Sequence, residues 1–209
     1  MKEKIEINAQ SSIKIKGEDK IIYIDPYLIE KDNNDADYIF ITHEHYDHLS
    51  LEDIKKVIKE DTIIVVPESC YSKVVDFGFN NEIHQVKPNN KYSLLDLTFQ
   101  TVAAYNTDKL YHTQSIEWVG YIIEVDGYSY YITGDTDINK ENKLVKCDVL
   151  LIPIGGVYTM NFQEAATLTN LIKPKLAIPT HYETIVGTKI DAVSYTKLLD
   201  ESIESQILY

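Results

Sequence analysis

Tyr38-Ile39-Phe40-Ile41-Thr42-His43-Glu44-His45-Tyr46-Asp47-His48 is the stretch that decides the fold. Residues 38–42 form an apolar, β-branched run that is typical of a buried strand. Residues 43–48 are polar and hold three of the six histidines of the chain. Ser50-Leu51-Glu52-Asp53 then begins a helical pattern through Lys59 with a capping-box arrangement. The sequence therefore predicts a histidine loop between a strand and a helix.

The spacing inside this loop predicts ligands for two metal ions. Residues two apart in an extended segment point the same way, so His43 and His45 can bind one ion. Asp47 and His48 lie in the turn toward the helix and can serve a second ion. Two such ions repel each other and need anionic ligands, which Asp47 supplies in part. Imidazoles favour zinc, so we expect two Zn²⁺ ions, with Mn²⁺ or Fe as alternatives because carboxylates are present.

Later strand ends offer further ligands. Asp135 follows the strand pattern YSYYITG of residues 128–134, and His181 follows the pattern KLAIPT of residues 175–180. A rigid sheet can hold side chains at such strand ends in a fixed constellation. Asp135 is expected to bridge both ions, and His181 to complete the second site.

The rest of the chain reads as sheets followed by helices, twice over, which suggests two β-sheets packed face to face with helices outside. Strand patterns occur at residues 5–9, 12–16, 20–25, 62–67, 82–87, 97–106, 117–126 and 148–154. Helical patterns occur near residues 69–77, from Asn161 with Glu164 to Pro174, and from Asp191 onward.

These blocks resemble those of the metallo-β-lactamase superfamily. HEHYDH matches its His-x-His-x-Asp-His loop, and the later Gly-Asp-Thr and Pro-Thr-His-Tyr elements follow in the same order. The blocks IDPYL, TGDTD, LLIPIGG and IPTHYET look most similar to the branch with ascorbate-phosphate lactonases and acyl-phosphatidylethanolamine phospholipases. The resemblance covers nearly the whole chain. It implies an α/β (α+β) fold, a four-layer αββα sandwich, in a single domain over residues 1–209.

The function that this resemblance implies is metal-dependent hydrolysis. A metal-bound hydroxide would attack a phosphoester or a lactone or other ester-type bond, so no protein nucleophile is required. Asp47 and His112 are the candidate catalytic residues, with Asp47 holding both a metal ion and the proton of the nucleophile. The alternative is a degenerate or mononuclear metal-binding protein of the same fold with a regulatory or redox role.

Two departures from the branch bear on the first metal ion. Where relatives carry a third histidine, this sequence reads Ala103-Ala104-Tyr105-Asn106, and an amide is a weak ligand. That site could hold its ion less tightly, use His112 from the following loop, or fill only with substrate. Gln10 stands where relatives often carry another histidine, and we assign it no role from the sequence.

Several other residues have two interpretations each. His112 is either an exposed loop histidine or a ligand, a proton donor or a contact to substrate phosphate. Asp25 either resembles the structural aspartate that supports the histidine loop or stabilises a turn. His84 reads as an ordinary strand residue, and Gly155-Gly156 as a tight turn near the metals.

Tyr105, Tyr158 and Tyr182 neighbour these blocks in sequence and could line a substrate pocket. Such a pocket would take a small-molecule substrate, and exposed sheet edges make a homo-oligomer compatible with this fold.

Composition excludes some other functions. The chain has 209 residues, of which 44% are hydrophobic, and a formal net charge of −13, which disfavours binding to a phosphate backbone. Nowhere do about 18 apolar residues follow one another, as a membrane span would need. Cys70 and Cys147 lack metal-type spacing and are expected to be free, buried thiols. With no leader pattern in the sequence, the expected location is cytoplasmic.

Overall fold

The computed structural model describes residues 4–208, and they fall into two compact units, residues 4–87 and Pro88–Leu208. Each unit contains its own sheet, six-stranded in residues 4–87 and seven-stranded in Pro88–Leu208. The predicted pair of sheets is therefore present. That residues 1–209 form a single domain stays a prediction.

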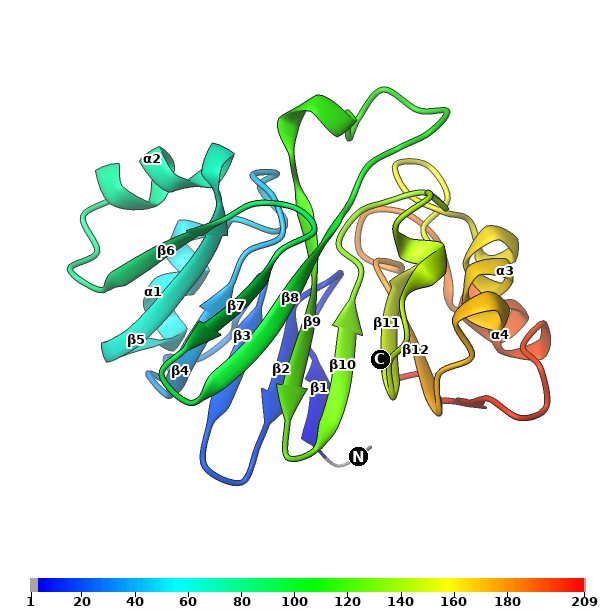
Figure 1. The fold of residues 1–209 in the computed structure, drawn as a ribbon, viewed down its shortest axis with the longest axis horizontal. Coiled ribbons are helices and arrows are strands. Elements are labelled where there is room, and N and C mark those ends of the chain that lie inside the picture. The colour runs from blue at the N-terminus through cyan, green and yellow to red at the C-terminus, as the bar shows by residue number, and fades with distance from the viewer. Residues whose placement is uncertain (1–3, 209) are drawn as a thin grey trace. The chain divides into compact units, whose positions relative to one another are not determined.

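The sheet of the first unit has the strand order β1-β2-β3-β4-β5-β6. Strands β1 to β3 pair antiparallel, and β3 to β6 pair parallel. Helix α2 lies beside β5 and β6 (Figure 1). The elements are β1 (Ile5–Ile7), β2 (Ile13–Lys16), β3 (Ile21–Ile24), β4 (Ala36–Phe40), α1 (Leu51–Val57), β5 (Ile58–Pro67), α2 (Glu68–Asp76) and β6 (Glu82–Val86).

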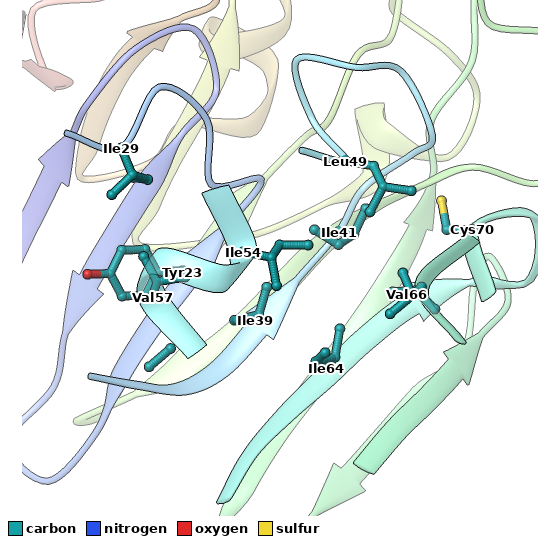
Figure 2. Close-up of a cluster of buried hydrophobic side chains, with 12 residues drawn as sticks. Tyr23, Ile29, Ile39, Ile41, Leu49, Ile54, Val57, Ile64, Val66 and Cys70 are labelled. Atoms are coloured by element: carbon teal, nitrogen blue, oxygen red, sulfur yellow. The ribbon is translucent and has the colours of Figure 1, made fainter. Parts of the chain in front are cut away.

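Helix α1 fixes the downstream end of the histidine loop. Ser50 is its N-cap, and the side chain of Ser50 accepts a hydrogen bond from the backbone N–H of Asp53. The apolar face of the helix carries Ile54 and Val57, which are fully buried against β4 and β5 (Figure 2). Burying each such side chain stabilises the fold by about 1.5–3 kcal/mol.

Asp53 ties this helix to the segment that follows β3. Its carboxylate accepts hydrogen bonds from Ser50 Oγ, Lys56 Nζ and the backbone N–H groups of Leu28 and Ile29. Burial of Asp53 opposes its ionisation, but these hydrogen bonds outweigh burial and lower its pKa.

The sheet of the second unit has the strand order β13-β12-β11-β10-β9-β8-β7. Strands β7 to β10 pair antiparallel, and β10 to β13 pair parallel. Its elements are β7 (Lys91–Leu94), β8 (Leu97–Ala103), η2 (Gln114–Ile116), β9 (Val119–Val125), β10 (Tyr128–Ile132), η3 (Asn142–Leu144), β11 (Val149–Pro153), α3 (Phe162–Ile172), β12 (Leu176–Thr180), α4 (Lys189–Lys197) and β13 (Glu204–Ser205).

Helices α3 and α4 lie side by side near β11 and β12 (Figure 1). Asn161 caps α3 in the predicted capping box with Glu164. The buried hydroxyl of Thr169 in α3 contacts the hydroxyl of Tyr195 in α4 at 2.8 Å. Within residues 4–208, no helix is long and apolar enough to cross a membrane.

Strand direction gathers the candidate ligands at one edge of each sheet. In the first unit β3 and β4 are parallel, so Asp25 and the histidine loop leave the sheet at the same edge. In the second unit β8, β10, β11 and β12 all run the same way, because β9 is antiparallel to both β8 and β10. The segments after these strands, which hold His112, Asp135 and His181, therefore share an edge as well.

Some element boundaries differ from those expected. Helix α1 ends at Val57 rather than at Lys59, because Ile58 pairs with Ala36 and begins β5. The strand expected over residues 97–106 ends at Ala103, and residues 104–106 enter a loop. Strands β7 and β13 were not predicted, because their short sequences are partly polar and show no clear apolar alternation.

Candidate metal-binding residues

Asp25 orients His48. It follows β3 with a positive φ of 47° and is fully buried. Its carboxylate accepts hydrogen bonds from Thr42 N at 2.8 Å, Thr42 Oγ1 at 2.6 Å and His48 Nδ1 at 2.7 Å. Burial raises the pKa of the Asp25 carboxyl, whereas His48 and Thr42 act in the opposite direction. With its proton on Nδ1, His48 keeps the lone pair of its neutral ring on Nε2.

Thr42 orients His43 in the same way. Its hydroxyl proton is donated to Asp25, so the hydroxyl oxygen accepts from His43 Nδ1, which lies 3.0 Å away. The lone pair of neutral His43 is then on Nε2, and this atom lies 3.0 Å from His45 Nδ1. Thr42 and Asp25 thus fix two imidazoles of the loop, those of His43 and His48.

Asp47 contacts both His48 and Gln10. Its Oδ2 atom lies 3.5 Å from His48 Nε2 and 3.5 Å from Gln10 Nε2, which donates to it. Gln10 is fully buried with a positive φ of 50°. This contact could not be predicted from the sequence, because Gln10 and Asp47 are 37 residues apart.

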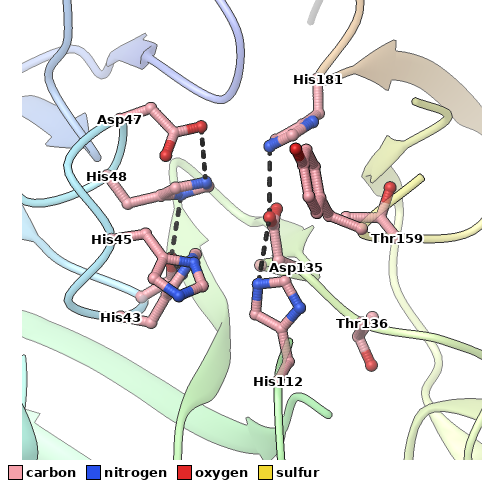
Figure 3. A network of polar contacts seen from close by, with 12 residues as sticks. His43, His45, Asp47, His48, His112, Asp135, Thr136, Thr159 and His181 are labelled. Carbon is pink, nitrogen blue, oxygen red and sulfur yellow. Dashed lines mark hydrogen bonds and ion pairs between the residues drawn. The ribbon is translucent and has the colours of Figure 1, made fainter. Parts of the chain in front are cut away.

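Asp135 lies between two imidazoles in the second unit (Figure 3). Its Oδ2 atom is 3.4 Å from His112 Nε2 and 3.2 Å from His181 Nε2. All three side chains are at least 97% buried. His112 is therefore not the exposed loop histidine of the first interpretation.

Asn106 contacts the other side of the His112 ring. Its Oδ1 atom lies 3.0 Å from the backbone N of His112 and 3.0 Å from His112 Nδ1. Its Nδ2 atom donates to the carbonyl oxygen of Tyr158 at 2.9 Å. The backbone N–H of Asn106 donates to the carbonyl oxygen of His112 at 2.7 Å. The three contacts between Asn106 and His112 close the loop of residues 106–112, and the fourth ties this loop to Tyr158.

The turn at Gly155 makes room for His181. A Cβ atom on Gly155 would lie 2.6 Å from the backbone oxygen of His181 and 2.5 Å from Val186 Cγ2. His181 itself has a positive φ of 57°, which is unusual for a residue with a side chain. Gly156 also has a positive φ, so the predicted tight turn is present.

The donor atoms within each unit are spaced as the ligands of a common ion would be. Two ligands on one tetrahedral zinc ion, with bonds of about 2.0–2.1 Å, lie roughly 3.3 Å apart. The corresponding contacts are His43 to His45 at 3.0 Å, Asp47 to His48 at 3.5 Å, Asp135 to His112 at 3.4 Å and Asp135 to His181 at 3.2 Å. The imidazole and carboxylate donors thus fit a divalent cation in kind and in spacing.

The remaining candidates have other surroundings. Tyr105 and Tyr182 are buried, and the Tyr105 hydroxyl donates to Glu141 at 2.8 Å. Burial and Glu141 raise the pKa of Tyr105 to about 12. His84 pairs with Glu82 on β6 at 2.6 Å, as expected of an ordinary strand residue.

The two cysteines are free thiols. Cys70 is fully buried and Cys147 is half-buried. Burial raises the pKa of both thiols to about 12, so they stay protonated and unreactive at neutral pH.

Comparison with known proteins identifies the family. The sequence profile described as "Beta-lactamase superfamily domain" matches residues 4–181, so the chain belongs to this superfamily. A UPF0173 metal-dependent hydrolase of Staphylococcus carnosus is 28% identical, over 98% of this chain and 96% of the relative.

Solved structures agree with this assignment. A Parabacteroides distasonis protein assigned as a metal-dependent hydrolase is 30% identical, with a TM-score of 0.83 over 97% of this chain and 91% of that one. The metallo-β-lactamase fold protein YhfI of Bacillus subtilis has a TM-score of 0.73 at 13% identity, over 96% of this chain and 88% of YhfI, which shows the fold alone. The predicted superfamily, fold class and metal-dependent hydrolase class are confirmed.

Proposed function

We propose that this chain hydrolyses a phosphoester or a lactone or other ester-type bond of a small molecule with the help of two divalent ions, in the first instance zinc. The residues that would hold the ions are His43, His45, Asp47, His48, His112, Asp135 and His181. His112 replaces the third histidine that Asn106 does not supply.

One observation carries the proposal. Asp135 Oδ2 lies within 3.4 Å of Nε2 of both His112 and His181. Asn106 holds the ring proton of neutral His112 on Nδ1, so Nε2 of His112 and the carboxylate oxygen of Asp135 are both electron-pair donors and repel each other at this distance. A shared cation turns this repulsion into attraction, which supports a metal site here.

A bound divalent ion would supply a nucleophile by lowering the pKa of water from 15.7 to about 7, and it would polarise the oxygen of the electrophile. The residues of this chain have separate parts in the reaction. Gln10 Nε2 donates a hydrogen bond to Oδ2 of Asp47, and we assign Oδ1 of Asp47 to the proton of the attacking water. Asp25 and Thr42 keep the His43 and His48 rings in place. The hydrogen bond from the Thr42 hydroxyl to Asp25 prevents the two rings from changing tautomer.

The leaving group needs a proton, and His112 is one candidate donor. The Asn106 contact favours a ligand role for His112 instead, because it holds the ring proton on Nδ1 and leaves Nε2 as an electron-pair donor. Asp47, after it takes the proton of the water, can pass it to the leaving oxygen.

Elemental analysis of protein purified without chelators tests the metal centre. We expect about two equivalents of metal, a loss with His48→Ala, and no change with the control His84→Ala, whose ring pairs with Glu82. No bound metal after addition of zinc and manganese would overturn the proposal.

Hydrolysis is then tested with bis(p-nitrophenyl) phosphate and with an aliphatic γ-lactone. Turnover of either substrate that His48→Ala abolishes and His84→Ala retains would support the proposed chemistry. Two bound metals with no turnover of any phosphoester, lactone or ester would instead favour the regulatory or redox alternative.

A further inference from the structure

Both ends of the Asn106 side-chain amide make hydrogen bonds, which argues against a vestigial ligand. Asn106 is 8% exposed. Its amide nitrogen donates to the Tyr158 carbonyl, and its amide oxygen accepts from the His112 backbone N–H. A carbonyl can only accept and a backbone N–H can only donate, so these two partners fix which end of the amide is oxygen.

This fixed orientation determines the tautomer of His112. The amide oxygen that accepts from the His112 backbone also lies 3.0 Å from His112 Nδ1. An oxygen can only accept, so Nδ1 must carry the ring proton. In the neutral ring, Nε2 then holds the lone pair and points to Asp135 at 3.4 Å.

We propose that Asn106 is a positioning residue that locks His112 in the Nδ1–H tautomer and thereby presents Nε2 as a ligand. This role of Asn106 rests on the proposed function in one respect only, namely that His112 Nε2 binds a metal ion. Asp25 does the same for His48 with a carboxylate, whereas Asn106 does it with a neutral amide. In both cases the buried oxygen that holds the ring also accepts a hydrogen bond from one other donor.

The loop around Asn106 is held independently of His112. The backbone N–H of Tyr105 donates to Thr136 Oγ1, and that of Thr107 donates to Asp137 Oδ2. Lys109 Nζ pairs with the same carboxylate at 2.6 Å. The backbone on both sides of Asn106 is therefore anchored to the segment after β10, so a change at Asn106 acts mainly on the ring of His112.

The direct test is the tautomer of His112 in metal-free protein. Long-range ¹H–¹⁵N NMR of histidine-labelled protein, with the His112 signals assigned by their loss in His112→Gln, should show Nδ1 protonated. Asn106→Ala should shift the ring toward the Nε2–H form. Asn106→Asp, which keeps an acceptor, should retain Nδ1–H. The control Asn142→Ala removes another buried amide, which bonds Asp137 O and Asn139 N, and should leave the tautomer unchanged.

Metal affinity gives the second readout. Loss of a group that orients a metal-binding histidine typically lowers affinity about 10–100-fold, and we expect this for Asn106→Ala but not for Asn142→Ala. Asn106→His should also lower affinity, because it removes the acceptor of His112.

The proposal is overturned if wild-type His112 is protonated on Nε2, if Asn142→Ala changes the tautomer as much as Asn106→Ala, or if Asn106→His raises metal affinity. One further outcome tests the ligand role of His112 separately from the positioning role of Asn106. If His112→Gln leaves metal affinity unchanged, His112 is not a ligand, whereas the tautomer result in metal-free protein still decides the role of Asn106.

Discussion

Replacing Asp25 by asparagine should weaken both the fold and metal binding. Asparagine tolerates the positive φ of 47° at this position, so the backbone can stay unchanged. Three donors converge on the carboxylate, two from Thr42 and one from His48 Nδ1. An amide has one acceptor oxygen, so its NH₂ group must face a donor or force His48 into the Nε2–H tautomer.

The magnitudes follow from these contacts. A buried donor without its acceptor costs about 1–3 kcal/mol of folding stability. Loss of the group that orients a metal-binding histidine typically lowers metal affinity about 10–100-fold. At about 1.4 kcal/mol per tenfold, that loss is roughly 1.4–2.8 kcal/mol of binding free energy. Urea unfolding of metal-free protein measures the loss of folding stability. Competition with a chelating indicator measures the loss of metal affinity.

Asp148→Asn is the matched control. Asp148 also accepts from the backbone N–H and the hydroxyl of one residue, Ser129, and pairs with a cation, Lys175, at 2.8 Å. It contacts no candidate ligand. Both variants should lose folding stability, and only Asp25→Asn should lose metal affinity. If Asp25→Asn keeps wild-type metal affinity, or if both variants lose it equally, the reasoning about His48 is wrong.

Three further predictions concern the supports of the candidate ligands. Asp53→Asn should cost about 1–3 kcal/mol at pH 7. Because the folded pKa of Asp53 is lowered, its ionised form stabilises the fold above about pH 4, the unfolded value, and this contribution is lost as pH falls through the folded pKa. The gap between variant and wild type in urea unfolding should therefore narrow in acid, and a gap independent of pH would contradict the assignment. Gly155→Ala should cost about 1–3 kcal/mol by overpacking and reduce metal content, because the new methyl meets the His181 backbone. Adding Val186→Ala to Gly155→Ala should not restore the metal content. Full recovery of the metal content in the double variant would show that only the Val186 side chain clashes with the new methyl group. Ile54→Ala should cost about 2–5 kcal/mol by opening a cavity under α1. Thermal unfolding compared with exposed Ile190→Ala checks this, and equal effects of the two would refute the packing argument.

Much of the architecture could be predicted from local pattern. The apolar run of β4, the capping box of α3 and the order of strands and helices follow from periodicity and cap chemistry, which act over a few residues. The errors lie at boundaries where long-range pairing competes with local propensity. Ile58 leaves the helical pattern because it pairs with Ala36, a residue 22 positions earlier that sequence periodicity does not reveal.

The sequence by itself determined the types of candidate ligand and the positions at which they leave the strands, because the histidine loop and the later aspartate and histidine follow apolar strand patterns. It could not determine how their supports converge. Asn106 lies 52 residues from Tyr158, and Gln10 lies 37 residues from Asp47. These contacts exist because tertiary folding brings strand ends to a common edge, and only there do fixed donors and acceptors decide the proton position on each imidazole.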